Sequence, residues 1–330
     1  MASSEGQQAA AIEAINRLEG YTSSTPNDNT RRILQAFIQH LPPDGKANIV
    51  SQISNCRNDI ELVSLAKTLV ENLLIPLKAA IILQSIPLEL SPLDRDAGPE
   101  RKPSELDEPD SSLQNDLLQL KQTCLVRDGY KCVVTGYFDH TYAMDEAPRH
   151  LSNAVPTQVA HIMPFVLGHV PEELKLERAK LWEALYTCFP RLGSILDPTK
   201  INHPSNALTL IPVIREQFGE FNLALESTER PNVYYIKTYP HFPQPYIRLF
   251  LPRNRLVTLR TDTDIPQPSK DLVETHAAIA QILSASGMGE TIDDLLAKLD
   301  DMTTLARDGT SRIEDLLAVQ LAKNMGQVVG

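Results

Sequence analysis

Apolar side chains recur at helical spacing in three stretches near the beginning of the chain. Residues 7–20 form the first stretch, the second follows Asn29 or Thr30, and the third follows the pair Asn58-Asp59. Amphipathic helices of this kind bury their apolar face against another element. We therefore expect them to cover the core of the protein; a dedicated partner-binding module is the alternative.

The composition changes between residues 87 and 112. This segment holds five prolines and many acidic residues, with hardly an aliphatic residue after Leu93. Such a composition buries too little apolar surface to fold and is typical of a flexible linker. The sequence thus predicts a helical N-terminal region over residues 1–86, a linker over 87–112, and a further domain from residue 113.

Helical and β patterns alternate in that further domain. Residues 112–127 predict a helix, which leads into a β run and a glycine turn ending at Gly136. Residues 157–165 predict a short apolar strand in which His161 is followed by Pro164. Because proline cannot continue a ladder, the histidine is placed at the end of the strand.

A second β run and a helix follow the histidine strand. The run spans residues 206–210 and is introduced by Asn206, and the helix extends from Pro212 to about Leu225. The helix predicted for residues 172–189 is then an insertion between the two strands. It either shapes a pocket beside the histidine or shields the sheet, and we expect shielding.

The remaining patterns predict a small sheet and a helical end. Strands are expected at residues 233–236, 246–251 and 256–259, and helices from residue 269 or 270 to 285, at 290–299 and at 311–325. The fold class is therefore α+β. The domain that begins at residue 113 ends near residue 260, and residues 261–330 form a helical C-terminal region.

Composition places the chain among globular proteins. With 330 residues, of which 42% are apolar, it is large enough to bury a substantial core. No apolar run has the length of a membrane span, and the first residues lack the pattern of a secretory signal. The four cysteines contain no C-x-x-C pair, which suits a reducing compartment and argues against a four-cysteine zinc site. We expect an intracellular protein, cytoplasmic or nuclear, with no membrane partner.

The formal net charge of −11 is unfavourable for binding phosphates, but it is unevenly distributed. Residues 1–112 hold 10 basic and 16 acidic side chains, residues 113–260 hold 16 and 14, and residues 261–330 hold 5 and 12. The middle of the chain is thus nearly neutral. Four arginines gather at its end and are either a solvated edge or a track for phosphates: Arg248, Arg253, Arg255 and Arg260.

Two motifs of the middle domain carry a resemblance to a known family. They are R-D-G-Y-K-C-V-V-T-G at residues 127–136 and Q-V-A-H-I-M-P-F at residues 158–165. Together with F-G-E-F at 218–221 and P-N-V-Y-Y-I at 231–236, they resemble a group of the HNH endonuclease family that is common in filamentous fungi. The likeness covers roughly residues 113–236. It implies a ββα-metal core, which the later strands extend as a small antiparallel sheet.

The resemblance also implies chemistry. In this family the histidine at the strand end removes a proton from a water molecule that attacks a phosphodiester, a task that suits an imidazole. A divalent ion (Mg, Mn or Zn) stabilises the charge that develops on the phosphoryl oxygens. His161 is then the general base, Asn206 holds the loop and the histidine in position, and nucleic acid is the partner.

Two metal-ligand positions of the family are occupied by other residues in this chain. The helix position that carries a ligand histidine in relatives is Arg215, and the residue before the base histidine is Ala160. An arginine keeps its proton and is no ordinary metal ligand. Candidate replacement ligands are Asp139, His140 and His203, with Glu216 and Glu220 on the helix.

This degenerate third position leaves two functions open, and the leading one is a metal-dependent phosphodiesterase or endonuclease that acts on nucleic acid. In a nuclease, Arg215 would act as a fixed cation that offsets phosphate charge where the metal has been lost. An arginine binds a carboxylate with the same bidentate geometry. The alternative is therefore a metal-free relative repurposed as a biosynthetic enzyme or binding protein for a small anionic or carbonyl substrate.

Overall fold

A computed structural model of the chain describes residues 4–23, 25–26, 28–84, 111–164, 167 and 175–303. The predicted linker lies outside the described residues except at its last two positions, and so does the predicted helix at 311–325. Within the described part of the chain, no helix has both the length and the apolar character needed to cross a membrane.

The N-terminal region is helical, as its apolar spacing predicts. Its elements are α1 (Ser4–Glu19), α2 (Thr30–His40), α3 (Pro43–Asn55), α4 (Asp59–Leu69), the π-helical turn η1 (Val70–Leu74) and α5 (Ile75–Gln84). Asn58 caps α4 by accepting a hydrogen bond from the Glu61 N–H at 3.0 Å. The sequence pattern missed α3, which begins with Pro43 in its first turn, where the missing proline N–H costs nothing.

The first motif does not form the predicted strand. Helix α6 (Ser111–Arg127) ends at the motif, and only Lys131 makes an isolated bridge, to Phe138. The Cys132 N–H donates to the Tyr137 carbonyl and the Gly136 N–H donates to the Cys132 carbonyl, both at 2.9 Å. The segment therefore closes on itself as a tight turn, and its backbone groups are used before a ladder can form.

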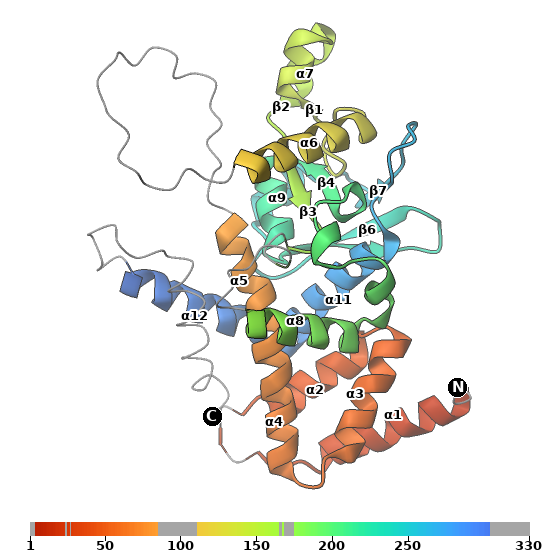
Figure 1. Ribbon diagram of the computed structural model, residues 1–330, viewed down its shortest axis with the longest axis vertical. Coiled ribbons are helices and arrows are strands. Elements are labelled where there is room, and N and C mark those ends of the chain that lie inside the picture. Colours follow the sequence, from red (N-terminus) through yellow and green to blue (C-terminus); the bar gives the residue numbers. More distant parts are fainter. Residues whose placement is uncertain are drawn as a thin grey trace.

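A small protruding unit follows this turn (Figure 1). It consists of β1 (Phe138–Asp139), α7 (His140–Asp145), the 3-10 helix η2 (Pro148–Asn153) and β2 (Ala154–Val155). The two short strands pair in parallel.

The second and third motifs form a strand pair and a helix in the predicted order. Strand β3 (Gln158–His161) pairs antiparallel with β4 (Ala207–Leu210), and α9 (Pro212–Gly219) follows β4 and packs against β3. The predicted helix end at Leu225 is wrong. Phe221 has a φ of 60°, outside the helical region, and Leu223 already begins the next strand.

The insertion between β3 and β4 is helical and links two regions of the chain. It contains α8 (Lys175–Cys188) and the 3-10 helices η5 (Pro190–Ser194), η6 (Pro198–Lys200) and η7 (Pro204–Asn206). Helix α8 packs against α3 and η1. The insertion thus joins the N-terminal helices to the middle of the chain, and its shielding of the sheet stays a prediction.

A three-stranded antiparallel sheet and two long helices complete the fold. The sheet has the order β5 (Leu223–Ser227), β6 (Val233–Thr238) and β7 (Leu256–Thr258), and the helices are α11 (Lys270–Ser286) and α12 (Met288–Thr303). The predicted strand at 246–251 is wrong, because this stretch lies largely in helix α10 (Gln244–Leu249). Pro243 caps that helix and Pro245 lies in its first turn, a position that favours helix over strand.

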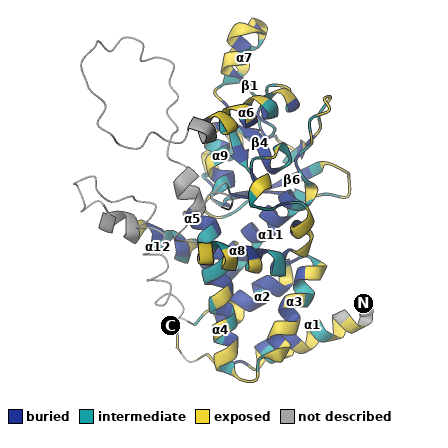
Figure 2. Cartoon of the chain, viewed as in Figure 1, coloured by how far each residue is buried: buried dark blue, intermediate teal, exposed yellow. Residues whose placement is uncertain are grey.

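One hydrophobic core runs through both ends of the chain. Helix α11 packs against α2 on one side and β5 on the other, and the buried residues of all these elements belong to one cluster. Figure 2 shows the buried positions along the facing sides of α2, α8 and α11. The mixed helical and antiparallel architecture is α+β, as predicted.

Candidate active site

His161 is the last residue of β3, and its side chain is half-buried. It stands opposite Ala207 in the antiparallel pair with β4. Its Nε2 lies 2.9 Å from Oδ1 of Asn202. An amide oxygen only accepts hydrogen bonds, so Nε2 carries the hydrogen and the neutral ring has its lone pair on Nδ1. The arrangement is that of a base whose orientation is set through its other nitrogen.

Asn206 is fully buried immediately before β4, and it ties two segments of the site together. Its Oδ1 accepts the Met163 N–H at 2.9 Å, and its Nδ2 donates to the carbonyls of Met163 and Ile201 at 3.0 and 2.9 Å. Met163 lies two residues after His161, and Ile201 immediately precedes Asn202. One amide thus fixes the chain on both sides of the His161–Asn202 hydrogen bond.

Arg215 lies on α9, which packs across β3. Its Nε donates to the Val159 carbonyl at 3.1 Å, two residues before His161. Burial lowers the pKa of the guanidinium, which nevertheless stays protonated. The helix therefore brings a fixed positive charge to the strand that carries the histidine.

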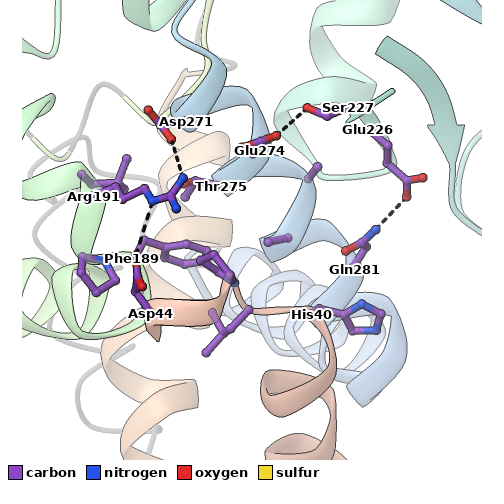
Figure 3. A pocket seen from close by; sticks show the side chains of 16 residues that line it. His40, Asp44, Phe189, Arg191, Glu226, Ser227, Asp271, Glu274, Thr275 and Gln281 are labelled. Atoms are coloured by element: carbon purple, nitrogen blue, oxygen red, sulfur yellow. Dashed lines mark hydrogen bonds and ion pairs between the residues drawn. The ribbon is translucent and has the colours of Figure 1, made fainter. Parts of the chain in front are cut away.

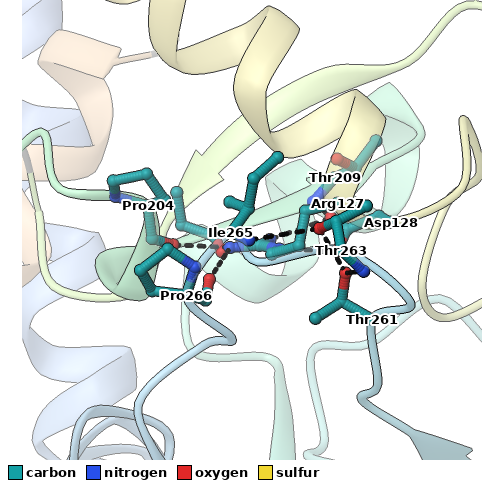
Figure 4. Close-up of polar contacts among 9 residues, drawn as sticks. Arg127, Asp128, Pro204, Thr209, Thr261, Thr263, Ile265 and Pro266 are labelled. Atoms are coloured by element: carbon teal, nitrogen blue, oxygen red, sulfur yellow. Dashed lines mark hydrogen bonds and ion pairs between the residues drawn. The ribbon is translucent and has the colours of Figure 1, made fainter.

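The first motif supplies a buried clamp. Arg127 and Asp128 form a bidentate pair. The arginine donates to the aspartate carboxylate from Nε at 2.8 Å and from Nη2 at 2.9 Å. Arg127 also donates to the carbonyls of Pro204 at 2.6 Å and Ala207 at 2.8 Å, and Asp128 accepts the Thr209 N–H at 3.0 Å (Figure 4). These bonds fasten the end of α6 to the segment that carries Asn206 and β4.

The metal-ligand candidates are dispersed. Asp139 is buried and accepts hydrogen bonds from the Thr157 hydroxyl at 2.6 Å and N–H at 3.2 Å. His140 is exposed at the start of α7. His203 is exposed, and its Nδ1 lies 2.8 Å from the Ser205 hydroxyl.

The two helix carboxylates differ in their surroundings. Glu216 is exposed, whereas Glu220 is half-buried and accepts a hydrogen bond from Asn222 at 2.8 Å. Burial is the main cause that raises the pKa of Glu220, and the neighbouring Glu216 adds to the rise. Among the described residues, neither carboxylate forms a hydrogen bond with the histidine strand.

A divalent ion does not fit the donors that the structure describes around His161. No group of three His, Cys, Asp or Glu side chains converges anywhere in the described residues. At the helix position next to β3 the chain presents Arg215, a cation that repels a metal ion. Two side chains contact the histidine strand instead: the amide of Asn202, which accepts a hydrogen bond from His161, and the guanidinium of Arg215, which donates to Val159.

A cavity of about 380 Å³ lies apart from these residues, between α2, η5, β5 and α11. Figure 3 shows Arg191 between Asp44 and Asp271, with nitrogen–oxygen distances of 3.4 and 3.8 Å. The cavity has Phe189 and Leu192 among its apolar lining residues. None of the predicted site residues lines it.

Two functional candidates are absent from the sequence-based set. Asn202 lies in a loop whose sequence I-N-H-P-S-N contains several turn-forming residues, and no local pattern distinguishes it from Asn206. The clamp of Arg127 and Asp128 was visible in the first motif only as a charged pair. An arginine directly followed by an aspartate before a glycine turn is the signal that could have found it.

In a comparison with protein families, a model described as HNH endonuclease matches residues 132–226. The matched segment contains β3, β4 and α9 with His161, Asn206 and Arg215. Searches of curated proteins and of solved structures give no match. The family match supports the HNH resemblance of this segment and a nuclease-like function.

Proposed function

We propose that residues 132–226 are the ββα core of a phosphodiesterase that cleaves nucleic acid, with His161 as the general base. The observation that carries the proposal is the hydrogen bond from His161 Nε2 to Asn202, held on both sides by Asn206. It orients an imidazole at a strand end inside the segment that matches the HNH endonuclease family.

The proposed roles follow from the contacts. Nδ1 of His161 takes a proton from the attacking water, and Asn202 stabilises the ring through Nε2 as it becomes positively charged. Asn206 is a positioning residue, because it acts through the backbone of Met163 and Ile201. Arg215 offsets the negative charge that builds up on the phosphoryl oxygens.

Members of the HNH family commonly use a divalent ion, which stabilises the same charge. Because the described donors do not form a site for one, we assign no step to a metal. The fixed guanidinium of Arg215 is the group in the chain whose chemistry matches that task.

The test is a cleavage assay on single-stranded and duplex DNA and RNA, with EDTA and with Mg²⁺, Mn²⁺ or Zn²⁺ added. We expect His161→Ala to reduce cleavage by about 100-fold or more, the usual size of a general-base contribution. Its melting temperature should stay within a few degrees of the native value, since the hydrogen bond to Asn202 that the substitution removes is a neutral side-chain bond.

His203→Ala is the matched control, because His203 is an exposed histidine next to Asn202, the hydrogen-bond partner of His161. It should keep full activity. Cleavage that persists in His161→Ala, or that disappears only together with the fold, contradicts the base assignment. Absence of cleavage under every condition contradicts the phosphodiesterase.

A further inference from the structure

Residues 229–260 form a basic segment in an acidic chain. They contain six cationic side chains and one carboxylate, Glu229, a local net charge of +5 in a chain of −11. The six are Arg230, Lys237, Arg248, Arg253, Arg255 and Arg260. The segment begins after residue 226, where the family match ends, so the match assigns it no role.

These six cations differ from many others in the chain in their surroundings. Among the described residues, none of the six forms an ion pair, whereas Arg17, Lys78 and Arg191 each pair with an aspartate. Five are exposed, and Arg255 is half-buried. Exposed cations that outnumber the carboxylates of their segment six to one create a positive potential that a polyanion neutralises.

The register of β6 and β7 brings cations together at one end of this strand pair. The Ile236 N–H donates to the Arg255 carbonyl at 2.7 Å. Lys237 follows Ile236, and Arg253 lies in the turn closed by the bond from the Arg255 N–H to the Pro252 carbonyl at 2.9 Å. Lys237 and Arg253 therefore lie at the same end of the pair, and both are exposed.

A second group lies at the opposite end. The Leu259 N–H donates to the Asn232 carbonyl at 2.9 Å, which brings Arg260 close to the β5–β6 turn that carries Arg230. The two ends are separated by the length of the six-residue strand β6, about 20 Å at 3.3 Å per residue. A duplex carries several phosphates over that length.

The exposed face of β6 adds an aromatic ring between the two groups. Tyr235 is 42% exposed and alternates with the buried Tyr234 and Ile236, so it shares a face with Lys237. An exposed ring beside a cation is suited to stacking on an unpaired base. β6 and β7 lie at the side of the molecule in Figure 1. The segment after β7 is connected to the first motif, because Arg127 donates to the Pro266 carbonyl at 3.4 Å.

We propose that the basic segment binds the sugar–phosphate backbone of the nucleic acid on which the HNH-like core acts. This inference rests on the proposed function, because a phosphodiesterase of nucleic acid needs a surface that holds the strand. A polyanion of regularly spaced phosphates fits two cationic groups at opposite ends of a strand pair. An anionic membrane is the competing partner, and the experiment includes it.

The test measures binding of a fluorescein-labelled duplex and a single strand by anisotropy, between 50 and 300 mM salt. It uses the full chain with His161→Ala, so that cleavage does not interfere. We expect the double variants Lys237→Gln/Arg253→Gln and Arg230→Gln/Arg260→Gln each to weaken binding by about tenfold. Each should also lower the slope of log K against log salt by about 2.

The matched control is Lys46→Gln/Arg57→Gln, which removes one charge from α3 and one from the connection between α3 and α4. It should leave both quantities nearly unchanged. Arg255 is kept, because its Nη1 is buried and its replacement could disturb folding. Tyr235→Leu should weaken binding of the single strand more than binding of the duplex.

Three results overturn the inference. In the first, the two double variants bind as tightly as the control. In the second, the protein with native cations binds neither the duplex nor the single strand. In the third, it binds only vesicles that contain phosphatidylserine. Failure of the inference remains distinguishable from failure of the proposed function, because binding is measured without catalysis. Unchanged binding with cleavage that depends on His161 refutes only the basic segment, and charge-dependent binding without cleavage refutes only the phosphodiesterase.

Discussion

At the scale of single residues, Asn202 decides which nitrogen of His161 holds the lone pair. We expect Asn202→Leu, which is similar in size and has no acceptor, to lower kcat by about 10- to 100-fold with little change in KM. The reason is that Nε2 loses its acceptor and the ring no longer favours one tautomer. Steady-state kinetics across a range of pH checks this.

A second variant, Asn202→Asp, tests whether Asn202 acts by positioning the ring of His161 or only by filling space. A carboxylate also accepts from Nε2–H and should recover much of the activity with a shifted pH profile, since it favours the charged imidazole. An Asn202→Leu protein with native kcat and an unchanged pH profile shows that the amide only fills space.

Arg215 stands at the helix position where the resemblance to the HNH family implies a ligand histidine, and it gives the second prediction. Arg215→His should raise the affinity for Mn²⁺ or Zn²⁺ by at least about tenfold over the native protein, because it places a neutral imidazole on α9 next to the histidine strand. Ala160 leaves the coordination shell short, so the gain is partial. Isothermal calorimetry measures it, with Arg215→Gln as the control that removes the charge without adding a ligand. If both variants bind metal equally, charge removal alone explains the gain.

At the scale of elements, α9 is joined to α11 through a buried histidine. His276 is 2% exposed and stacks on Phe218 at 3.8 Å and on Phe221 at 4.7 Å between ring centroids. Its Nε2 donates to the Phe218 carbonyl at 2.9 Å, and its Nδ1 is buried with no hydrogen-bond partner among the described residues. Burial lowers the pKa of His276 to about 3.

This histidine should make stability depend on pH. Between about pH 6.5, where histidine in an unfolded chain titrates, and pH 3, the unfolded state binds the extra proton. Stability is therefore complete above pH 6.5 and falls by about 1.4 kcal/mol per pH unit as the pH decreases through that window. His276→Gln keeps a donor for the Phe218 carbonyl but does not titrate. Urea unfolding gives the free energy of unfolding at pH 7.5 and at pH 5. Between these two pH values, this free energy should decrease by about 2 kcal/mol less in the variant than in the native protein.

The exposed His241 provides the control, since His241→Gln removes a histidine whose imidazole stays in contact with water. Its pH dependence should match that of the native protein. Equal losses in His276→Gln and the native protein show that other groups cause the acid sensitivity.

The limits of sequence reasoning are also clearest at this scale. Strong helical periods predicted α2, α4, α6 and α11, and the placement of His161 before Pro164 predicted the end of β3. The segment at 246–251 has the β-branched and aromatic composition of a strand, but prolines at its start and packing of Tyr246 on the core select a helix. The hydrogen bond between His161 and Asn202 joins residues that are 41 positions apart in the sequence, and no local pattern encodes it.

At the scale of the whole molecule, the N-terminal helices and the C-terminal helices share one core. Leu34 and Phe37 of α2 are fully buried in the cluster that also contains Ile279 and Leu283 of α11. Polar contacts join the same regions, since Arg32 Nε donates to the Ala285 carbonyl at 2.8 Å and Lys78 pairs with Asp293. The division of the chain at residues 87–112 remains a prediction from composition.

The shared core predicts what happens when the chain is cut at that division. A specific protease site placed within residues 87–112 should be cleaved readily, since this stretch has the composition of a linker. The two fragments should then elute together in size-exclusion chromatography, because separating them exposes the apolar faces of α2 and α11 to water, which costs about 25 cal/mol per Å².

The variant Phe37→Ala, which removes a fully buried ring, should let the fragments separate at a lower urea concentration. Ile60→Ala is the matched control, because Ile60 is 80% exposed and its loss leaves the core intact. Fragments that separate in buffer alone, each retaining its helical circular dichroism, would show that residues 1–86 fold as an independent unit and that the core between α2 and α11 contributes little to holding the chain together.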